Sequence, residues 1–464
     1  MNLILFAGLL GVMLMVCGLF VQNKRTISFL AIGFLAFLLF ANSLEIISGK
    51  PFIGMNIGTM IQTTRFGLLM NEIMLLACLL YFFVSGRHIE QVGKHVAEYY
   101  ALIFFILAGA GIATSYVNLL MLFLGIEIIS IPLYILTASE KRNLKSNEGA
   151  LKYFLMGSFS TGIMLMGIAM IYGGTGSLMI SKMNLDASPL SYPLVTGVLL
   201  LMLSMAFKVG AAPFHFWTPD VYDGAPTVFT SFMATIVKVA AFAAFVNLFV
   251  DSTQVFPRDK WKVVIAIIIA TTLIVGNITA VFQQSVKRML AYSSIAQAGF
   301  MMFALFSYNY ISREGIVIYA AAYCFATIGL FAILLKMDDY TYEGFNGFAK
   351  KEPQLAALAT IFLISLAGIP ITAGFFGKYY MIASAIKATE GKFLWLIIIA
   401  MLSAAVGVYY YFRVIQAMYF KADTNERVQP VVVSSAFRFG LVILAVLIII
   451  IGIMPQTLLQ YLYF

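Results

Sequence analysis

Four ionisable side chains stand inside long apolar stretches of the sequence, where charges are rare. They are Glu127 in LFLGIEIISIPLY, Lys208 in LLMLSMAFKVGAAPF, Lys238 in FMATIVKVAAFAAF and Lys378 in GIPITAGFFGKYYMI. A charge at the centre of a bilayer costs at least roughly 3 kcal/mol on insertion scales, and such residues usually line a polar pathway or pair with one another. Carboxylate and amine groups in this setting predict proton transfer inside a membrane.

The alternative for each lysine is that its long side chain reaches the lipid headgroups. This is a poor explanation for Lys238, because about a dozen apolar or small residues flank it on each side. Lys208 precedes a helix break at Pro213, and Lys378 follows one at Gly368–Gly374. A break in a membrane helix is tolerated only beside protein or a water-filled cavity, and breaks recurring in two halves point to a transport site.

Lysine suits proton transfer once it is buried, because burial disfavours its charged form and a nearby carboxylate favours that form. Glu127 is the carboxylate placed to do this for Lys208, and we expect the two to pair. His215 follows Lys208 by seven residues and either relays protons or caps a broken helix. Tyr292 and the two serines after it are candidates for extending a hydrogen-bonded path.

The composition sets the class of protein that must position these residues. The chain has 464 residues, of which 62% are hydrophobic and 11% are charged, whereas soluble domains carry about 25% charged residues. Its apolar runs are near the length of about 20 residues that crosses a bilayer. About 14 spans are therefore predicted, at 3–21, 27–47, 64–84, 99–115, 117–138, 148–174, 192–216, 226–249, 261–282, 289–306, 315–336, 353–385, 394–420 and 437–462.

Charges outside the spans predict the orientation. The formal net charge of +9 reflects Lys and Arg clusters in alternate loops, such as Lys24-Arg25 and Lys287-Arg288. Cytoplasmic loops accumulate such residues, so both termini are predicted on the non-cytoplasmic side, and nucleic-acid binding is not indicated. The segment Thr218–Ala225, read as a loop, departs from the pattern because Asp220 and Asp223 would lie on the cytoplasmic side.

The cysteines predict no metal centre. Cys17, Cys78 and Cys324 each lie within an apolar run, far apart in the sequence, and no CxxC motif occurs. Iron–sulfur and zinc sites need clustered thiolates. We expect all three to be buried small hydrophobic residues, and the chain to hold no metal.

At these motifs the sequence resembles a known family. Phe207–Lys238, reading FKVGAAPFHFWTPDVYDGAPTVFTSFMATIVK, closely resembles the seventh and eighth helices of the antiporter-like subunits of respiratory complex I, the proton-pumping NADH:quinone oxidoreductase. VKRMLAYSSIAQAGF, LAGIPITAGFFGKYY and FLGIEIISIPLY resemble its ninth-to-tenth helix junction, its broken twelfth helix and its fifth helix. WTPDVYDGAPT is similar to the N-type branch, the counterpart of mitochondrial subunit 2, whereas the sister types L and M typically read PDAMEGPTP.

The resemblance implies an all-α integral membrane fold of about 14 helices, with two inverted five-helix repeats and broken seventh and twelfth helices. The implied divisions are 1–97 for helices one to three, 98–250 for the first repeat, 251–420 for the second repeat and 421–464 for the last helix. It also implies roles for individual residues, namely Glu127 and Lys208 as a coupling pair, Lys238 as the central relay, Lys378 as the exit-side lysine, and Glu148 and Lys152 as residues that tune activity.

Cofactors and partners follow from the same resemblance. This chain would hold no redox cofactor, because the flavin, the iron–sulfur clusters and the quinone site of that family's complexes lie in other subunits. The expected partners are the sister antiporter-like subunit M, the small subunits K and J, and lipids. The expected place is the bacterial inner membrane, with both termini periplasmic, and the expected role is that of a translocase subunit.

Three other readings stay open. The first is a subunit of a multi-subunit sodium/proton antiporter, against which the PDVYDGAP wording argues. The second is the membrane arm of a hydrogenase or of the photosynthetic relative, which genomic neighbours would separate. The third is a membrane scaffold without transport, which pumping that survives loss of Lys208 or Lys238 would favour.

Overall fold

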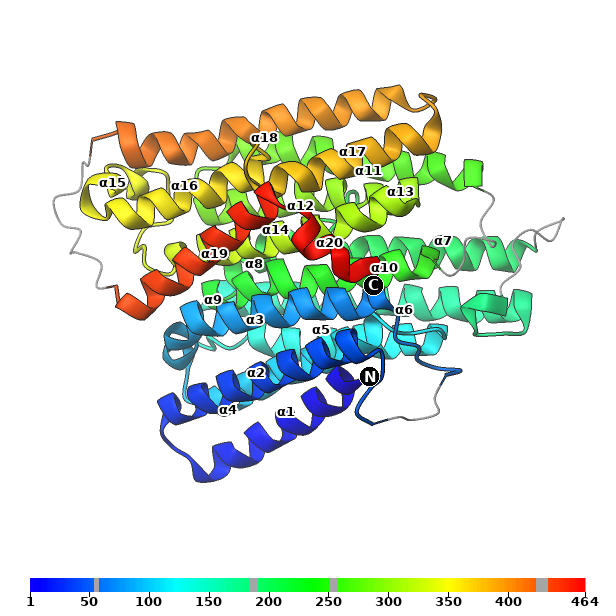
Figure 1. Ribbon diagram of the computed structural model, residues 1–464, viewed down its shortest axis with the longest axis horizontal. Coiled ribbons are helices and arrows are strands. Elements are labelled where there is room, and N and C mark those ends of the chain that lie inside the picture. The colour runs from blue at the N-terminus through cyan, green and yellow to red at the C-terminus, as the bar shows by residue number, and fades with distance from the viewer. Residues whose placement is uncertain (54–57, 183–190, 251–257, 423–432, 464) are drawn as a thin grey trace.

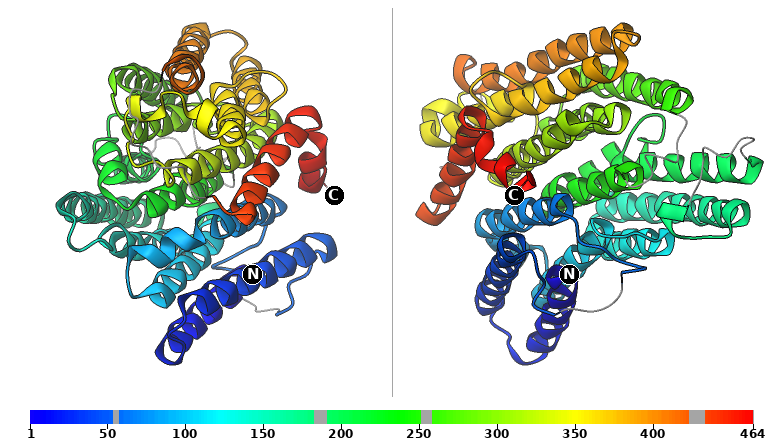
Figure 2. Two further views of the ribbon diagram at one scale, coloured as in Figure 1. Left: turned by 90° about the vertical axis from the view of Figure 1, so that its left-hand side faces the viewer. Right: turned by 45° about the vertical axis from the view of Figure 1, so that its right-hand side comes forward.

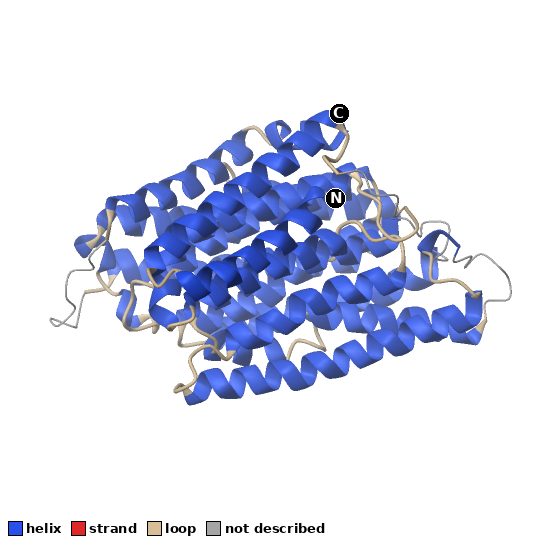
Figure 3. Cartoon of the chain, turned by 90° about the horizontal axis from the view of Figure 1, so that it is seen from below, coloured by secondary structure: helices blue, strands red, loops and turns tan. Residues whose placement is uncertain are grey.

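Helices make up nearly all of the computed structural model (Figure 3). The described residues are 1–53, 58–182, 191–250, 258–422 and 433–463. Within these ranges, extended pairing is limited to three isolated bridges between loops. Among the described residues, 13 helices are long and apolar enough to cross a membrane. Large apolar side chains such as Leu19, Phe20 and Phe420 are at least 80% exposed, which suits lipid rather than water.

In the first half of the chain the helices end close to the predicted limits. They are α1 (Asn2–Phe20), α2 (Lys24–Ser48), α3 (Arg65–Val92), α4 (Val96–Ala113), α5 (Leu119–Thr137), α6 (Leu144–Thr175), the short η1 (Ile180–Lys182), α7 (Tyr192–Val209), α8 (Trp217–Gly224), α9 (Thr227–Phe232), the π-helical turn η2 (Met233–Val237) and α10 (Lys238–Val250).

The second half continues with the same kind of element. It contains α11 (Arg258–Phe282), α12 (Val286–Met301), α13 (Phe303–Ser307), α14 (Tyr310–Leu334), the short η3 (Glu343–Phe345), α15 (Phe348–Lys351), α16 (Pro353–Ala367), α17 (Ala373–Thr389), α18 (Leu394–Phe420), α19 (Ser435–Ile453) and α20 (Gln456–Tyr463). The all-α membrane fold predicted from the sequence is confirmed.

The helices lie roughly side by side, with the first helices at one edge and α18 at the other, while the last helices α19 and α20 return to the middle beside α3 and α14 (Figure 1). Figure 2 shows α1 and α18 at opposite edges, with α10 and α14 between them. The apolar window of α14 is 100% buried and that of α1 only 28%. Because α14 packs against α3, α16, α17 and α19, it forms the centre of the bundle. The outer position of α1 also explains why Cys17 is only half-buried, unlike Cys78 and Cys324, which corrects that expectation.

The first predicted helix break is present, but part of the segment that follows it is helical and not a loop. Helix α7 ends at Gly210, whose φ of 73° is left-handed and favours glycine. The freed amide of Ala212 donates to the Thr272 hydroxyl at 3.0 Å. The reading of Thr218–Ala225 as a loop is wrong, because Trp217–Gly224 forms α8. This helix is too short and too polar for a length rule to detect.

The second break separates α16 from α17 within the long predicted twelfth span. Helix α16 ends at Gly368 with a φ of 84°, and α17 begins at Ala373. The last predicted span, 437–462, is also interrupted, because α19 ends at Ile453 and α20 begins after Pro455. A proline ends a helix by removing an amide donor and clashing with the preceding turn.

Candidate functional site

Lys208 and Glu127 lie together in the first half of the chain, as the sequence predicts. Lys208 is in the last turn of α7 and Glu127 in α5, and Nζ of the lysine is 4.0 Å from Oε1 of the carboxylate. The Thr161 hydroxyl of α6 accepts a hydrogen bond from Lys208 at 3.3 Å and donates one to Glu127 at 2.7 Å. Ser130 accepts a second hydrogen bond from the lysine at 3.0 Å. One hydroxyl thus connects the amine to the carboxylate.

Lys238 lies deep in the bundle, directly after the π-helical turn η2. Single π-helical turns inside α-helices are frequent at functional sites. Its Nζ donates to the carbonyl oxygen of Ser294 at 2.7 Å and to the hydroxyl of the same residue at 3.1 Å. The side chain is 4% exposed, and the described part of the chain gives it no ion-pair partner. This lysine therefore has neutral oxygen ligands only.

Lys378 uses the carbonyl groups that the second break sets free. Its Nζ donates to the carbonyl oxygens of Leu366 and Ala367, both at 2.9 Å, in the last turn of α16. A helix end leaves such carbonyls without intrahelical partners. The ammonium also lies 5.0 Å from the ring centroid of Phe300. The break thus supplies the site with acceptors for a cation without using a carboxylate.

A chain of polar side chains connects the surroundings of Lys238 with those of Lys378. Ser293, next to the Ser294 that binds Lys238, is hydrogen-bonded to the Tyr411 hydroxyl of α18. Gln297 donates to that hydroxyl at 3.0 Å and to the Leu366 carbonyl at 3.0 Å. Because Lys378 donates to the same carbonyl, described hydrogen bonds run from Ser293 to Lys378. Lys238 lies beside this path, since it binds the adjacent Ser294, which no described hydrogen bond joins to Ser293.

A small cavity adjoins this path at the Lys378 end. It has room for about one water molecule, and its polar lining is Gln297, Tyr319, Tyr323, Ser365 and Lys378. Tyr319 donates to Gln297 from one wall. The hydroxyls of Tyr323 and Ser365 have no partner among the described residues. The cavity therefore offers several unused hydrogen-bonding groups to a water molecule.

The two supporting residues Glu148 and Lys152 belong to a half-exposed charged cluster at the junction of α6, α8 and α12. Lys152 pairs with Glu148 at 2.8 Å and with Asp220 at 2.9 Å. Arg288 of α12 reaches the other oxygen of Asp220 at 3.0 Å and lies 3.8 Å from Asp223. Asp220, which departed from the loop-charge pattern, thus holds one basic residue from each half.

His215 and Tyr292 are not joined to this network by any hydrogen bond between described residues. His215 lies between α7 and α8, is 8% exposed and stacks on Phe216 at 4.6 Å. Its Nδ1 has no partner among the described residues. Tyr292 packs, partly buried, against the core. Their relay roles stay predictions.

Sequence reasoning missed Thr161, which bridges Glu127 and Lys208, and Gln297, Tyr319 and Tyr411, which lie in the polar path to Lys378. Uncharged polar residues are common in membrane helices, so their types alone gave little signal. Gln297 follows Ser293 by one helical turn in YSSIAQAGF, which places the two on one face of α12. That spacing was the one available hint.

The chain is similar to known membrane subunits over most of its length. A family described as NADH:quinone oxidoreductase/Mrp antiporter, transmembrane, matches residues 115–407. NADH-quinone oxidoreductase subunit N of Cytophaga hutchinsonii is 42% identical over 397 residues, which cover 83% of this chain and 84% of that protein. The protein of the same description from Flavobacterium psychrophilum is 34% identical over 472 residues, covering 100% of each.

Solved structures give the same picture of the fold. A chain of respiratory complex I from Thermus thermophilus superposes with a TM-score of 0.84 at 31% identity, covering 99% of both chains. A chain of the archaeal membrane-bound sulfane sulfur reductase superposes with a TM-score of 0.88 at 24% identity, covering 99% of this chain and 95% of that chain, which shows the fold alone. The matched family, the subunit N relatives and this geometry together show that the chain belongs to the antiporter-like membrane subunits of NADH:quinone oxidoreductase, in their subunit N branch.

Proposed function

We propose that this chain moves protons across the membrane as the subunit N of an NADH:quinone oxidoreductase, through Glu127, Lys208, Lys238 and Lys378. NADH oxidation and quinone reduction take place in other subunits and drive the transfer from a distance, as coupling between separate sites. The observation that carries the proposal is Lys238. It is a buried amine whose described ligands are all neutral, beside a polar path that leads to a second buried amine.

The ligands of each amine set how firmly it holds a proton. The carboxylate of Glu127 favours the charged form of Lys208, and its withdrawal would release that proton. Lys238 has no such carboxylate among the described residues, so its burial disfavours the charged form and only the Ser294 oxygens offset this. At Lys378, two carbonyl oxygens and an aromatic ring stabilise the charged ammonium.

The serine and tyrosine hydroxyls and a water molecule in the cavity would carry the proton between the last two lysines, while Gln297 orients the Tyr411 hydroxyl. Hydroxyls and water both donate and accept hydrogen bonds, as such a relay needs. The first transfer, from Lys208 to Lys238, lacks a described hydrogen-bonded path and would depend on water between α7 and α10.

The complete assembly follows the same proposal. Segments 98–250 and 251–420 would be inverted repeats that each supply a half-channel, and residues 1–97 and 421–464 would flank them. The neighbours would be the sister subunit M and the small subunits K and J. The chain would lie in a bacterial inner membrane with both termini on the periplasmic side.

The test is proton pumping in membrane vesicles from cells that carry Lys238→Met, with NADH as the donor. We expect pumping to fall strongly while the complex assembles, because methionine is an unbranched side chain of nearly the same length but cannot carry a proton. Lys141→Met, at an exposed loop position, is the control and should pump normally. Unchanged pumping by an assembled Lys238→Met complex would show that this lysine is structural and that the relay is wrong.

A further inference from the structure

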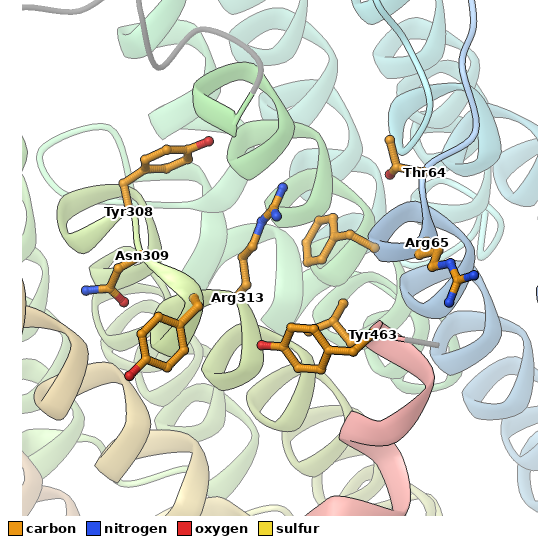
Figure 4. Close-up of a pocket in the computed structure, with 9 residues that line it drawn as sticks. Thr64, Arg65, Tyr308, Asn309, Arg313 and Tyr463 are labelled. Carbon is orange, nitrogen blue, oxygen red and sulfur yellow. The ribbon is translucent and has the colours of Figure 1, made fainter.

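A pocket of about 380 Å³ lies where the starts of α3 and α14 meet the last helix α20 (Figure 4). Its lining comes from Thr64, Arg65 and Phe66, from residues 308–310 with Arg313, and from Leu462 and Tyr463. Nothing in the proton relay uses these residues. The pocket lies at the ends of two spans, at the level where a membrane helix meets water.

Two arginines give the pocket its charge. Arg65 and Arg313 line it from different helices, both are exposed, and neither has a hydrogen-bond or ion-pair partner among the described residues. Arg288 and Arg438, in contrast, each pair with a carboxylate. Among the described residues, the lining of the pocket contains no acidic side chain. Two guanidinium groups are thus left available for an anion.

The rim of the pocket adds a further basic residue, Lys387. Lys387 of α17 donates to the Tyr310 hydroxyl at 2.8 Å and lies 4.4 Å from the centroid of that ring. Glu314, next to Arg313, accepts a hydrogen bond from Tyr463 at 2.7 Å. Partial burial and this carboxylate raise the pKa of Tyr463 to about 12, so its hydroxyl remains a donor at neutral pH. At the pocket and its rim the described residues thus place three basic side chains, Arg65, Arg313 and Lys387, against the carboxylate of Glu314.

The remaining walls suit a ligand that is anionic at one end and apolar at the other. Tyr308, Tyr310 and Tyr463 are of the type that gathers at membrane–water interfaces, and Phe66 and Leu462 are apolar. Guanidinium groups bind phosphate oxygens in a two-pronged geometry that lysine cannot reproduce. The positive ends of the α3 and α14 dipoles add to the same preference.

We propose that this pocket binds the phosphate group of an anionic phospholipid through Arg65 and Arg313. A free phosphate ion shares the same head chemistry, and an acidic segment of a neighbouring subunit would offer carboxylates instead. The interfacial tyrosines and the place at the ends of the spans favour the lipid. The proposal is independent of the proton relay.

The test uses the assembled complex in detergent and a photoactivatable phosphatidylglycerol, with label on this subunit as the readout. Each basic side chain near an anionic lipid contributes about fivefold in binding, so Arg65→Gln with Arg313→Gln should lower labelling by about tenfold or more. Arg142→Gln, exposed in the connection between α5 and α6, is the matched control and should label as the unaltered complex does. If the double Gln variant does not assemble, Arg65→Lys with Arg313→Lys keeps the charge and should label several-fold less.

Competition separates the possible ligands. Excess unlabelled phosphatidylglycerol should abolish the label, while phosphatidylcholine and millimolar inorganic phosphate should leave it. Equal competition by inorganic phosphate would assign the pocket to a soluble anion and overturn the lipid proposal. Labelling that is equal in the unaltered and the double-variant complexes would overturn it too. Labelling of the unaltered complex that phosphatidylglycerol does not reduce would be non-specific, and no labelling at all would show that a neighbouring chain covers the pocket; either result would overturn the proposal.

Discussion

At the residue scale, the three buried lysines differ in the groups that stabilise their charged form. Lys208 has a carboxylate at 4.0 Å, Lys238 has the oxygens of one serine, and Lys378 has two freed carbonyls. A carboxylate stabilises an ammonium more than neutral oxygens do, because it adds a full opposite charge. In the proposed relay, a change in the distance between Glu127 and Lys208 would therefore be the step at which remote energy input has the largest effect on proton affinity.

The Thr161 hydroxyl should matter to this pair although it carries no charge. Thr161→Val keeps the shape but removes the hydrogen bond to Glu127 and the acceptor for Lys208. A hydrogen bond to a charged group contributes about 1.5 kcal/mol, so we expect protons pumped per NADH oxidised to fall up to about tenfold. Thr161→Ser retains the hydroxyl and should pump nearly normally. Equal pumping by the two variants would exclude the bridging role.

The Tyr411 hydroxyl is the corresponding link between Lys238 and Lys378. Tyr411→Phe removes the partner of Ser293 and Gln297, leaves buried polar groups unsatisfied and should lower stability by about 1–3 kcal/mol. Proton pumping should fall by more than the loss of stability accounts for. Tyr81→Phe is the control, since that buried hydroxyl donates to a backbone carbonyl at 3.1 Å outside the path. Pumping rates that decline alike in both variants would contradict the link.

Sequence alone identifies the charged residues of the site and not the neutral ones between them. A lysine in an apolar run is costly and therefore informative, whereas a threonine or tyrosine there is ordinary. The position of Glu127 near Lys208 followed from the absence of any other suitable carboxylate. The role of Tyr411 depends on α18 packing beside α12, which lies more than a hundred positions earlier and which periodicity cannot show.

At the element scale, the second helix break has a residue that the geometry requires. Gly368 has a φ of 84°, and a Cβ added there would lie 2.8 Å from Cδ of Lys378. Gly176 ends α6 with a φ of 67° and has nothing within 4 Å of an added Cβ. Alanine at either position should destabilise by roughly 1–2 kcal/mol through backbone strain alone.

Comparing Gly368→Ala with Gly176→Ala therefore separates the effect of backbone strain from the effect of contact with Lys378. Gly368→Ala must also displace the Lys378 side chain, so we expect it to lower proton pumping as well as the thermal unfolding midpoint of the complex. Gly176→Ala should lower the midpoint only. Measuring both quantities on both complexes decides the matter, and normal pumping by Gly368→Ala would show that the position of Lys378 tolerates adjustment.

Helix limits were predictable where apolar length decides them, as in α18, whose predicted and observed ranges are both 394–420. They were missed where a short helix depends on its neighbours. Helix α8 has eight residues and packs against α6 and α12. Helix α20 also has eight, and Tyr463 near its end is bonded to Glu314 of α14. Tertiary contacts, not composition, hold both in place.

At the scale of the whole molecule, the two halves meet at a charged junction as well as through the apolar core. Asp220 in α8 receives hydrogen bonds from Lys152 of α6 at 2.9 Å and from Arg288 of α12 at 3.0 Å. The loop-charge rule read this acid as an anomaly, because the rule counts charges and cannot see that the segment folds back onto both halves. The hydrogen bonds from Lys152 and Arg288 explain why an acidic residue lies on that face.

Asp220→Asn should loosen this junction in a way that salt reveals. The cluster is half-exposed, so salt should weaken the two ion pairs of Asp220, and most of their contribution should be lost at ~1 M salt, where the Debye length is about 3 Å. We expect the thermal midpoint of the variant complex to lie below that of the unaltered complex in dilute buffer and to approach it as salt is added. Glu343→Gln, at an exposed position without a described partner, should give no difference at either salt concentration. A deficit in Asp220→Asn that persists undiminished in high salt would mean that the aspartate acts through packing of α8, and that the electrostatic junction between the halves is not what stabilises them.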